Sequence, residues 1–427
     1  MKILFLVLLT LIVTNCYSQS DIQSFVTRNS SLIRSIDPAS TDNSDLESIA
    51  NSIGDARIVM LGEQDHGDAP TYLAKTRLIR YLHEKKGFNV IAFESDLFSA
   101  TIGFENIKGS TADYLKFYKG NIVPFWTLCD ACDPLFSKVI PESFNTSTPY
   151  ILAGFDCQLI YKYSDSHLPD FLDSIARKNE LAVLKNQVAF EYLLSITDTL
   201  SNAFLCSTKN EKFFLRSASL LNNLSEEFKI KMGNQNIASL LLDNLVAFAN
   251  QLRLTKNDFT SSVNVRDIQM AANLKWLATV KFPGQKIIVW GANYHISKNM
   301  GNFKKRSLNQ NISMATEFVK DTLLNKQTYT LGFTSFSGEA GRLFSKTFQV
   351  DEPDKNGIET WIPSSMDYAF VDLKRFNSLF PQFDKDFEMK SCVSDEKVHK
   401  SYPAQWNKMF DGLFFIRHMY PCKVIKL

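Results

Sequence analysis

The sequence lacks the signatures of several common enzyme classes. No G-x-S-x-G elbow occurs, and the stretch Gly332-Phe333-Thr334-Ser335 departs from it, so a serine hydrolase with that elbow is poorly supported. The metalloprotease motif H-E-x-x-H and a glycine-rich phosphate loop are also missing. No internal repeat or low-complexity tract is visible. Any catalytic chemistry must therefore come from another arrangement of residues.

The sequence also lacks an excess of charge of one sign. Its 427 residues carry 47 basic and 45 acidic side chains, and the net charge is +2. A nucleic-acid-binding surface usually needs a basic stripe, often with interleaved aromatic residues, and none is present. We therefore expect no nucleic-acid partner. The chain is long for one compact core and predicts one enlarged domain or two closely packed ones.

The apolar run near the N-terminus, from Ile3 to Val13, is too short to span a membrane. It follows Lys2 and precedes small and polar residues, a pattern typical of a signal peptide. We predict that residues 1–18 are removed, that the protein is exported to the periplasm or the extracellular space, and that it has no transmembrane span. A lipid anchor at Cys16 is the less favoured alternative.

Six cysteines follow Cys16, which is compatible with disulfides but not dense enough for a disulfide scaffold. Cys129 and Cys132 form a C-x-x-C motif, but no second such pair exists to complete a four-cysteine zinc site. We expect a local disulfide between these two residues, or two buried thiols, rather than redox catalysis.

Short apolar segments separated by helix-length stretches predict an α/β fold with a mostly parallel central sheet flanked by helices on both faces. A helix from Thr71 to Lys86 fits the first crossover, and another is expected from Ile22 to Ile36 within a polar N-terminal segment, 19–50. The predicted strands are 57–61, 89–93, 150–154, 286–291, 328–334, 367–373 and 412–416.

The stretch 166–262 has leucine and phenylalanine at helical spacing and no β-branched runs. We predict a helical cap inserted between two parts of the α/β core, 51–165 and 263–427. Such a cap would enclose a sizeable apolar substrate. The alternative is that these helices merely flank the sheet.

Ionisable residues come directly after two of the predicted strands. The first strand is followed by the segment Gly62-Glu63-Gln64-Asp65-His66-Gly67, and the next ends in Glu94. Ligands bind at the carboxyl edge of open α/β sheets, and an imidazole is the natural general base near neutral pH. We expect His66 to act as that base, oriented by Glu63, Asp65 or Glu94. The alternative is a histidine that caps the following helix.

His295 stands behind another predicted strand and is expected at the same edge. Two histidines across one cleft can divide the labour, since one takes a proton from water while the other donates one. A histidine bonded in a strand-end loop is the structural alternative. The other histidines, His83, His167, His399 and His418, are expected to be structural or solvated.

These residues resemble the motifs of the erythromycin esterase family. Its Gly-Glu-x-x-His-Gly motif, strand-end glutamate, Arg-Asp-x-x-Met segment and Asn-x-His segment are matched, and so is the Arg-Leu-Ile-Arg-Tyr-Leu type run that ends the helix after the first motif. The matching residues are Gly62, Glu63, His66, Gly67, Arg77–Leu82, Glu94, Arg266, Asp267, Met270, Asn293 and His295. One departure is Lys75, which stands where the family's esterases carry an arginine. Lysine keeps the charge but loses the planar fork.

The resemblance implies hydrolysis of a lactone or other carboxylic ester, in the type members the macrolactone of a macrolide antibiotic, which would make the chain a resistance enzyme. His66, oriented by Glu63 or Glu94, would activate water without a covalent intermediate. His295 and a cationic side chain would stabilise the oxyanion, and no cofactor would be required. Substrate-binding residues would be Lys75, Arg77, Arg266 and Asn293, with the Lys75 ammonium facing the cleft.

Two other functions remain open from the sequence. The same fold could belong to a non-catalytic exported protein that binds a metal or haem, with His66 or His295 as a ligand. A hydrolase that uses a bound divalent metal is the other, because Glu63, His66, Glu94 and His295 are all ligand types. The motif Glu63-x-x-His66 lies on a turn, where this spacing fixes no ligand geometry.

Overall fold

The computed structural model describes residues 17–107, 109–206, 211–303, 310–391 and 399–425. Almost all of the predicted signal peptide, including Cys16, lies outside these ranges. None of the helices in the described ranges is long and apolar enough to cross a membrane. The strands are β1 (Ser31–Ile33), β2 (Ile58–Leu61), β3 (Phe88–Asp96), β4 (Ile151–Asp156), β5 (Lys286–Trp290), β6 (Thr328–Ala340), β7 (Phe348–Val350), β8 (Tyr368–Val371), β9 (Phe387–Ser391), β10 (Lys400–Ala404) and β11 (Gly412–Met419).

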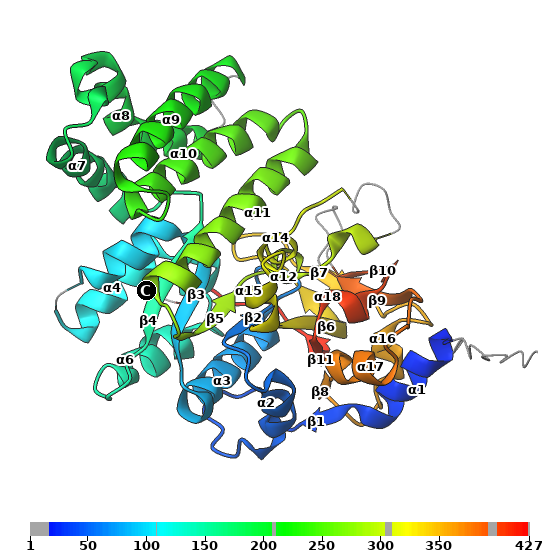
Figure 1. Ribbon diagram of the computed structural model, residues 1–427. Coiled ribbons are helices and arrows are strands. Elements are labelled where there is room, and N and C mark those ends of the chain that lie inside the picture. The colour runs from blue at the N-terminus through cyan, green and yellow to red at the C-terminus, as the bar shows by residue number, and fades with distance from the viewer. Residues whose placement is uncertain (1–16, 108, 207–210, 304–309, 392–398, 426–427) are drawn as a thin grey trace, which may run out of the picture.

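The α-helices surround the strands in the arrangement of Figure 1. They are α1 (Gln19–Asn29), α2 (Glu47–Ile53), α3 (Ala69–Lys86), α4 (Thr111–Asn121), α5 (Pro124–Thr127), α6 (Ile140–Ser143), α7 (Lys162–Lys178), α8 (Gln187–Cys206), α9 (Glu211–Met232), α10 (Ile237–Leu254), α11 (Phe259–Trp276), α12 (Asn293–Ile296), α14 (Met314–Phe318), α15 (Thr322–Lys326), α16 (Ile358–Trp361), α17 (Leu373–Leu379) and α18 (Trp406–Met409).

The main sheet has nine strands in the order β1-β8-β11-β6-β2-β5-β3-β4, with β7 paired to β6. The strands from β11 to β4 are parallel, whereas β1, β8 and β7 pair antiparallel with their neighbours. A mostly parallel sheet flanked by helices was expected from the sequence, and the structure confirms it. A separate two-stranded sheet pairs β9 with β10.

The central strands are buried because both faces of the sheet are covered. Successive side chains of a strand point to opposite faces, and in β2 Ile58 and Met60 enter one apolar cluster whereas Val59 and Leu61 enter the other. Residues of α3 belong to the second cluster. This explains why these strands are continuous apolar runs rather than alternating patterns.

Two local predictions need correction. The helix expected from Ile22 to Ile36 ends at Asn29, since Ser30 is extended and Ser31–Ile33 pairs with β8 as an edge strand. Pairing with a strand more than 300 residues away cannot be seen in local periodicity. The strands β7, β9 and β10 were not predicted either. The helix expected from Thr71 begins earlier, at Ala69, and ends at Lys86 as predicted, before Gly87 in the left-handed conformation with φ +71°.

The helices α7, α8, α9 and α10 group together at one end of the molecule, and α11 runs from this group toward the sheet (Figure 1). They occupy the stretch in which a cap was predicted. The helix α11 crosses the predicted boundary at residue 263 without a break. It therefore links the helical group directly to the edge of the core.

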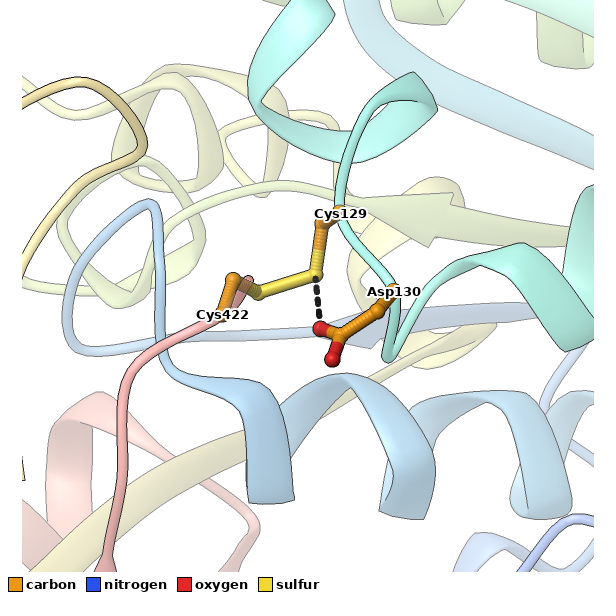
Figure 2. A group of neighbouring side chains, drawn as sticks. All are labelled: Cys129, Asp130 and Cys422. Atoms are coloured by element: carbon orange, nitrogen blue, oxygen red, sulfur yellow. Dashed lines mark hydrogen bonds between the residues drawn. A yellow bond between two sulfur atoms is a disulfide. The ribbon is translucent and has the colours of Figure 1, made fainter. Parts of the chain in front are cut away.

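A disulfide joins two distant parts of the chain. Figure 2 shows Cys129, just after α5, bonded to Cys422 in the C-terminal segment. The expected local disulfide between Cys129 and Cys132 is wrong, and of the alternative, two buried thiols, only Cys132 is one. The C-terminal segment also bonds through its backbone to the motif loop, where Cys422 N–H donates to the Gly67 carbonyl at 2.8 Å.

Loss of this disulfide should reduce stability. The substitution Cys422→Ser is expected to lower the free energy of unfolding by about 2–5 kcal/mol, as for native disulfides in general. Denaturant unfolding of the variant and of the wild type, each with and without reductant, measures the effect. Reductant should weaken the wild type to the level of the variant and leave the variant unchanged. A wild-type unfolding curve insensitive to reductant would contradict the assignment.

Candidate active site

The candidate site lies at the carboxyl ends of neighbouring parallel strands. The strands β2, β5, β3 and β4 lie next to one another in this order and share one direction. Residues that come after parallel strands meet at the same edge of the sheet. Glu63 and His66 follow β2, Glu94 lies in the last part of β3, and His295 lies in α12 just after β5.

His66 is held in place by Glu63. Nδ1 of His66 lies 2.7 Å from Oε1 of Glu63. The Glu63 side chain is completely buried, whereas that of His66 keeps 20% of its surface exposed. The ring of Phe125 stacks on the imidazole with centroids 5.9 Å apart. Within the described ranges Nε2 of His66 has no hydrogen-bond partner, so this nitrogen is the one available to an incoming water or substrate.

The environment makes His66 a stronger base. Burial alone would lower its pKa, but the hydrogen bond and the negative charge of Glu63 oppose it, and Glu94 adds to them. The net result is a pKa raised above the ordinary 6.5. A base with a pKa near the working pH is well suited to proton transfer.

Glu63 is a buried carboxylate, and both of its oxygens accept hydrogen bonds. Its Oε2 accepts a hydrogen bond from Nζ of Lys75 at 2.8 Å, and its Oε1 accepts one from Nε1 of Trp126 at 3.2 Å. Nζ of Lys75 also lies 3.8 Å from the ring centroid of Trp290. A carboxylate so fixed orients His66 and does not itself reach a substrate. The alternative in which the motif caps the following helix does not hold, because no side chain caps α3, whose N-cap residue is Asp68.

Glu94 faces cations from two other elements. Its Oε1 lies 2.9 Å from Nη2 of Arg266 and 3.1 Å from Nε2 of His295, and its Oε2 accepts the backbone N–H of Ala292. Burial would raise the Glu94 pKa, but the charges of His295, Arg266 and His66 hold it well below 4.5. Glu94 is therefore an ionised carboxylate at neutral pH.

His295 sits between two carboxylates. Its Nδ1 lies 2.7 Å from Oδ1 of Asp267, on the side opposite Glu94. Burial alone would lower the pKa of His295, but Asp267 and Glu94 together raise it to about 10. His295 is consequently an imidazolium at neutral pH.

Arg266 completes this second cluster. It lies on α11 and bonds Asp156 through Nε and Nη2, while its Nη1 lies 3.4 Å from Nε2 of His295. Its side chain is 17% exposed, more than those of Glu94 and His295. The guanidinium therefore forms the outer wall of the cluster.

The structure brings His66 and Glu63 together, and Glu94, Arg266 and His295 together beside them. It does not bring Arg77 to the site, because the Arg77 guanidinium bonds the buried Asp45 on the far side of α3. Asn293 has both amide atoms bonded to the backbone of Phe333, so it fixes the middle of β6 rather than a substrate. The substrate-binding roles expected for Arg77 and Asn293 do not fit this geometry.

Lys75 is also placed differently from the expectation. It points to the site, but it is completely buried and its charge is neutralised by Glu63. Burial lowers its pKa even though Glu63 opposes this shift. Lys75 donates a hydrogen bond to Glu63, and Glu63 bonds His66, so Lys75 acts on His66 only indirectly.

The substitution Lys75→Arg should change stability rather than ester preference. A larger guanidinium must enter a closely packed position, which costs about 1–3 kcal/mol in comparable cores. Thermal unfolding together with KM values across small and large esters measures both effects. The exposed Lys85 on the same helix provides the control, since Lys85→Arg should leave stability unchanged. A clear shift in ester preference without loss of stability would restore direct substrate contact by Lys75.

Four further residues belong to the site and were not assigned to it from the sequence. Asp156 ends β4, so the strand-end argument used for Glu94 would have found it. Asp267 stands within a recognised motif beside Arg266. Trp126 lies in the short helix α5 and Arg342 in the loop after β6, both far from the motifs in sequence, and no local pattern marks them.

Residues of the types that can bind a metal form a close group in another part of the molecule. Within the described ranges, three ligand atoms lie within 4.8 Å of one another at Cys129, Asp130 and Cys422, and two of these residues form the disulfide. Glu63, His66, Glu94 and His295 form no such group there. They lie in two bonded pairs, Glu63 with His66 and Glu94 with His295. Their further partners are Lys75, Arg266 and Asp267.

A pocket of about 560 Å³ opens between the predicted cap helices and reaches Arg266. Its wall is largely apolar on the side of α8 and α9 and carries polar groups near α10 and α11. The lining residues are Ala203, Phe204, Glu211, Phe214, Gln251, Leu252, Arg253, Thr255, Lys256, Asn257, Phe259, Ser262, Val263 and Arg266.

Known proteins resemble this chain over most of its length. Over 414 residues the chain is 28% identical to "Putative hydrolase YbfO" of Bacillus subtilis, a match that covers 92% of this chain and 90% of that protein. It is 20% identical to "Erythromycin esterase type II" of Escherichia coli, over 87% of this chain and 92% of that protein. A solved structure of an erythromycin esterase mutant, EreC in its open conformation, has the same fold with a TM-score of 0.67 at 17% identity, covering 92% of this chain and 98% of the other.

The model of the family described as "Erythromycin esterase" matches residues 144–419. This range includes Asp156, Arg266, Asp267 and His295, and it begins after the His66 motif and Glu94. The relatives cover the N-terminal part as well. The chain therefore belongs to the erythromycin esterase family and is a hydrolase.

Proposed function

We propose that this hydrolase cleaves a lactone or other carboxylic ester with water activated by His66, without a covalent intermediate. The observation that carries the proposal is the buried Glu63 bonded to Nδ1 of His66, which leaves Nε2 free at a partly exposed position. This is the arrangement of a general base and its orienting carboxylate. No serine or cysteine nucleophile is required.

These residues account for each proton transfer in the proposed reaction. Neutral His66 donates its Nδ1 proton to Glu63 in a hydrogen bond, and its Nε2 takes a proton from water as the water oxygen bonds to the ester carbonyl carbon. The carbonyl oxygen becomes an oxyanion, which the positive charges of His295 and Arg266 stabilise. The carbon–oxygen bond to the alcohol then breaks, and the alkoxide takes a proton from His66 or His295.

Stabilisation of the oxyanion is usually the largest contribution to such a rate enhancement, at about 3 kcal/mol per donor. His295 suits this role because its two carboxylate partners keep it protonated at neutral pH. Glu94 holds His295 and Arg266 on the same side of the site. It is thereby a positioning residue for both cations.

The pocket beside Arg266 supports a bulky and largely apolar substrate. A volume of about 560 Å³ is within the range of small-molecule sites. A macrolide is one candidate of this size and character. The Cys129–Cys422 disulfide supports export, since disulfides persist in oxidising compartments.

The proposal is tested with a panel of esters that includes small acyl esters, lactones and macrolides. We expect turnover of at least one ester, with release of free acid and alcohol and no burst of acyl-enzyme. Turnover should persist after dialysis against a chelator, and the purified protein should show no haem absorbance. Activity that is lost with chelator and restored by a divalent metal would favour the metal-dependent hydrolase instead. A haem spectrum without ester turnover would favour the binding protein.

A further inference from the structure

One cation near His66, Arg342, keeps hydrogen-bond donors that the other site residues do not occupy. Arg342 follows the end of β6, and its side chain is 48% exposed. Its Nε donates a hydrogen bond of 2.6 Å to Oδ1 of Asp65, whose own side chain is only 3% exposed. Asp65 precedes His66 directly, so this bond fixes the guanidinium to the motif loop.

Close packing places the backbone of Arg342 against the same loop. A Cβ atom added to Gly67 would lie 2.2 Å from the carbonyl oxygen of Gly341 and 2.9 Å from the Cα of Arg342. Gly67 also has φ +157°, a backbone conformation that favours glycine. Only glycine lets the loop approach this closely. His66 therefore lies between two residues, Asp65 and Gly67, that both contact Arg342 or its neighbour. The positive charge of Arg342 also acts to lower the pKa of His66, although Glu63 outweighs it.

The terminal nitrogens of Arg342 are free for a ligand. Within the described part of the chain, the Arg342 side chain donates its hydrogen bond to Asp65 through Nε, and neither Nη1 nor Nη2 has a hydrogen-bond partner. An arginine held by Nε still presents two parallel N–H groups, which match the two oxygens of a carboxylate. The other cations near the site differ in this respect, because the Lys75 ammonium is completely buried against Glu63 and all three guanidinium nitrogens of Arg266 lie within 3.4 Å of Asp156, Glu94 or His295.

We propose that Arg342 forms an anion-binding subsite beside His66 and selects esters whose acyl or alcohol part carries a carboxylate. The inference rests on the proposed ester hydrolysis and adds a substrate class to it. Asp65 is the positioning residue of this subsite, since it holds the guanidinium through Nε and leaves the other two nitrogens to the substrate.

The first experiment compares two esters of equal length, one that ends in a carboxylate and one that ends in a neutral amide. For the carboxylate ester, Arg342→Gln should raise KM about 10-fold or more, as expected for a hydrogen bond to a charged group. For the amide ester, KM should change less than about 2-fold. Arg342→Lys should restore part of the affinity, because it keeps the charge but not the fork. Equal effects of Arg342→Gln on the two esters would overturn the proposal.

Lys346→Gln is the matched control. Lys346 is an exposed lysine in the same segment, and its loss removes the same charge without touching Asp65. It should leave the preference for the carboxylate ester intact. A Lys346→Gln variant that loses the preference as strongly as Arg342→Gln would show a diffuse charge effect and contradict a subsite at Arg342.

A binding measurement keeps this proposal separate from the proposed function. Glutarate, a dicarboxylate that cannot be hydrolysed, should raise the Tm of the wild type and of Lys346→Gln but not that of Arg342→Gln. If no ester is cleaved and glutarate still protects through Arg342, ester hydrolysis fails and the anion subsite stands. If esters are cleaved and glutarate protects Arg342→Gln as well as the wild type, the subsite fails alone.

Discussion

Replacing His66 by glutamine should lower kcat for ester hydrolysis by about 10²–10⁴, the usual contribution of a positioned general base. Glutamine is close in size and uncharged, so the buried Glu63 keeps its bonds to Lys75 and Trp126. Thermal unfolding should therefore change little. The measurement is kcat on an ester that the wild type cleaves, with Tm as the check on folding.

The substitution Glu63→Gln tests how Glu63 sets the pKa of His66. Glu63 raises the pKa of His66, so its loss should lower that pKa and move the acid limb of kcat/KM to lower pH. Residues that act as one unit fail together, so the double variant should lose little more than His66→Gln alone. Substantial turnover by His66→Gln would remove His66 from the role of base.

Replacing His295 by glutamine should lower kcat by about 10²–10³, the range seen when one oxyanion donor is lost. In the proposed mechanism the imidazolium places a positive charge near the developing oxyanion, and a neutral amide cannot replace it. Its loss also leaves the buried Glu94 with Arg266 as its remaining side-chain cation, so a loss of stability is expected as well. Kinetics must therefore be compared with unfolding curves of the same variant.

Asp267→Asn separates the charge of His295 from its presence. Asp267 and Glu94 raise the His295 pKa from 6.5 to about 10, and removal of the first carboxylate should lower it again. The alkaline limb of kcat/KM should then move to lower pH, while the rate below the new pKa is kept. An unchanged alkaline limb in Asp267→Asn would show that the His295 charge does not control the rate.

The same pKa shift predicts how stability depends on pH. A group whose pKa is raised on folding stabilises the protein fully below its unfolded value and loses this contribution as pH rises through the folded value. For His295 the window runs from 6.5 to about 10. The wild-type Tm should fall across this window, and the fall should be smaller in Asp267→Asn. Tm values measured from pH 6 to 10 check the sign.

The sequence by itself determined the parts of the fold that depend on local pattern. Buried strands such as Ile58–Leu61 are continuous apolar runs, and the topology of an α/β sheet places the residues after such strands at one edge. This is why the amino-acid sequence alone was enough to assign Glu63, His66, Glu94 and His295 to one site. The helical stretch within 166–262 was predicted from its periodicity in the same way.

The tertiary structure decided which charges meet, because partners that lie on different helices, strands and loops leave no local signal. It paired Lys75 with Glu63 and turned an expected substrate anchor into a buried support. It paired Arg77 with Asp45 and bonded Cys129 to Cys422, 293 residues away. The charge of His295 has the same origin, since Asp267 and Glu94 reach it from separate elements and together raise its pKa, whereas His66 is bonded to Glu63 alone among the carboxylates. The sequence marks a residue as ionisable, and only the fold sets its neighbours and hence its charge.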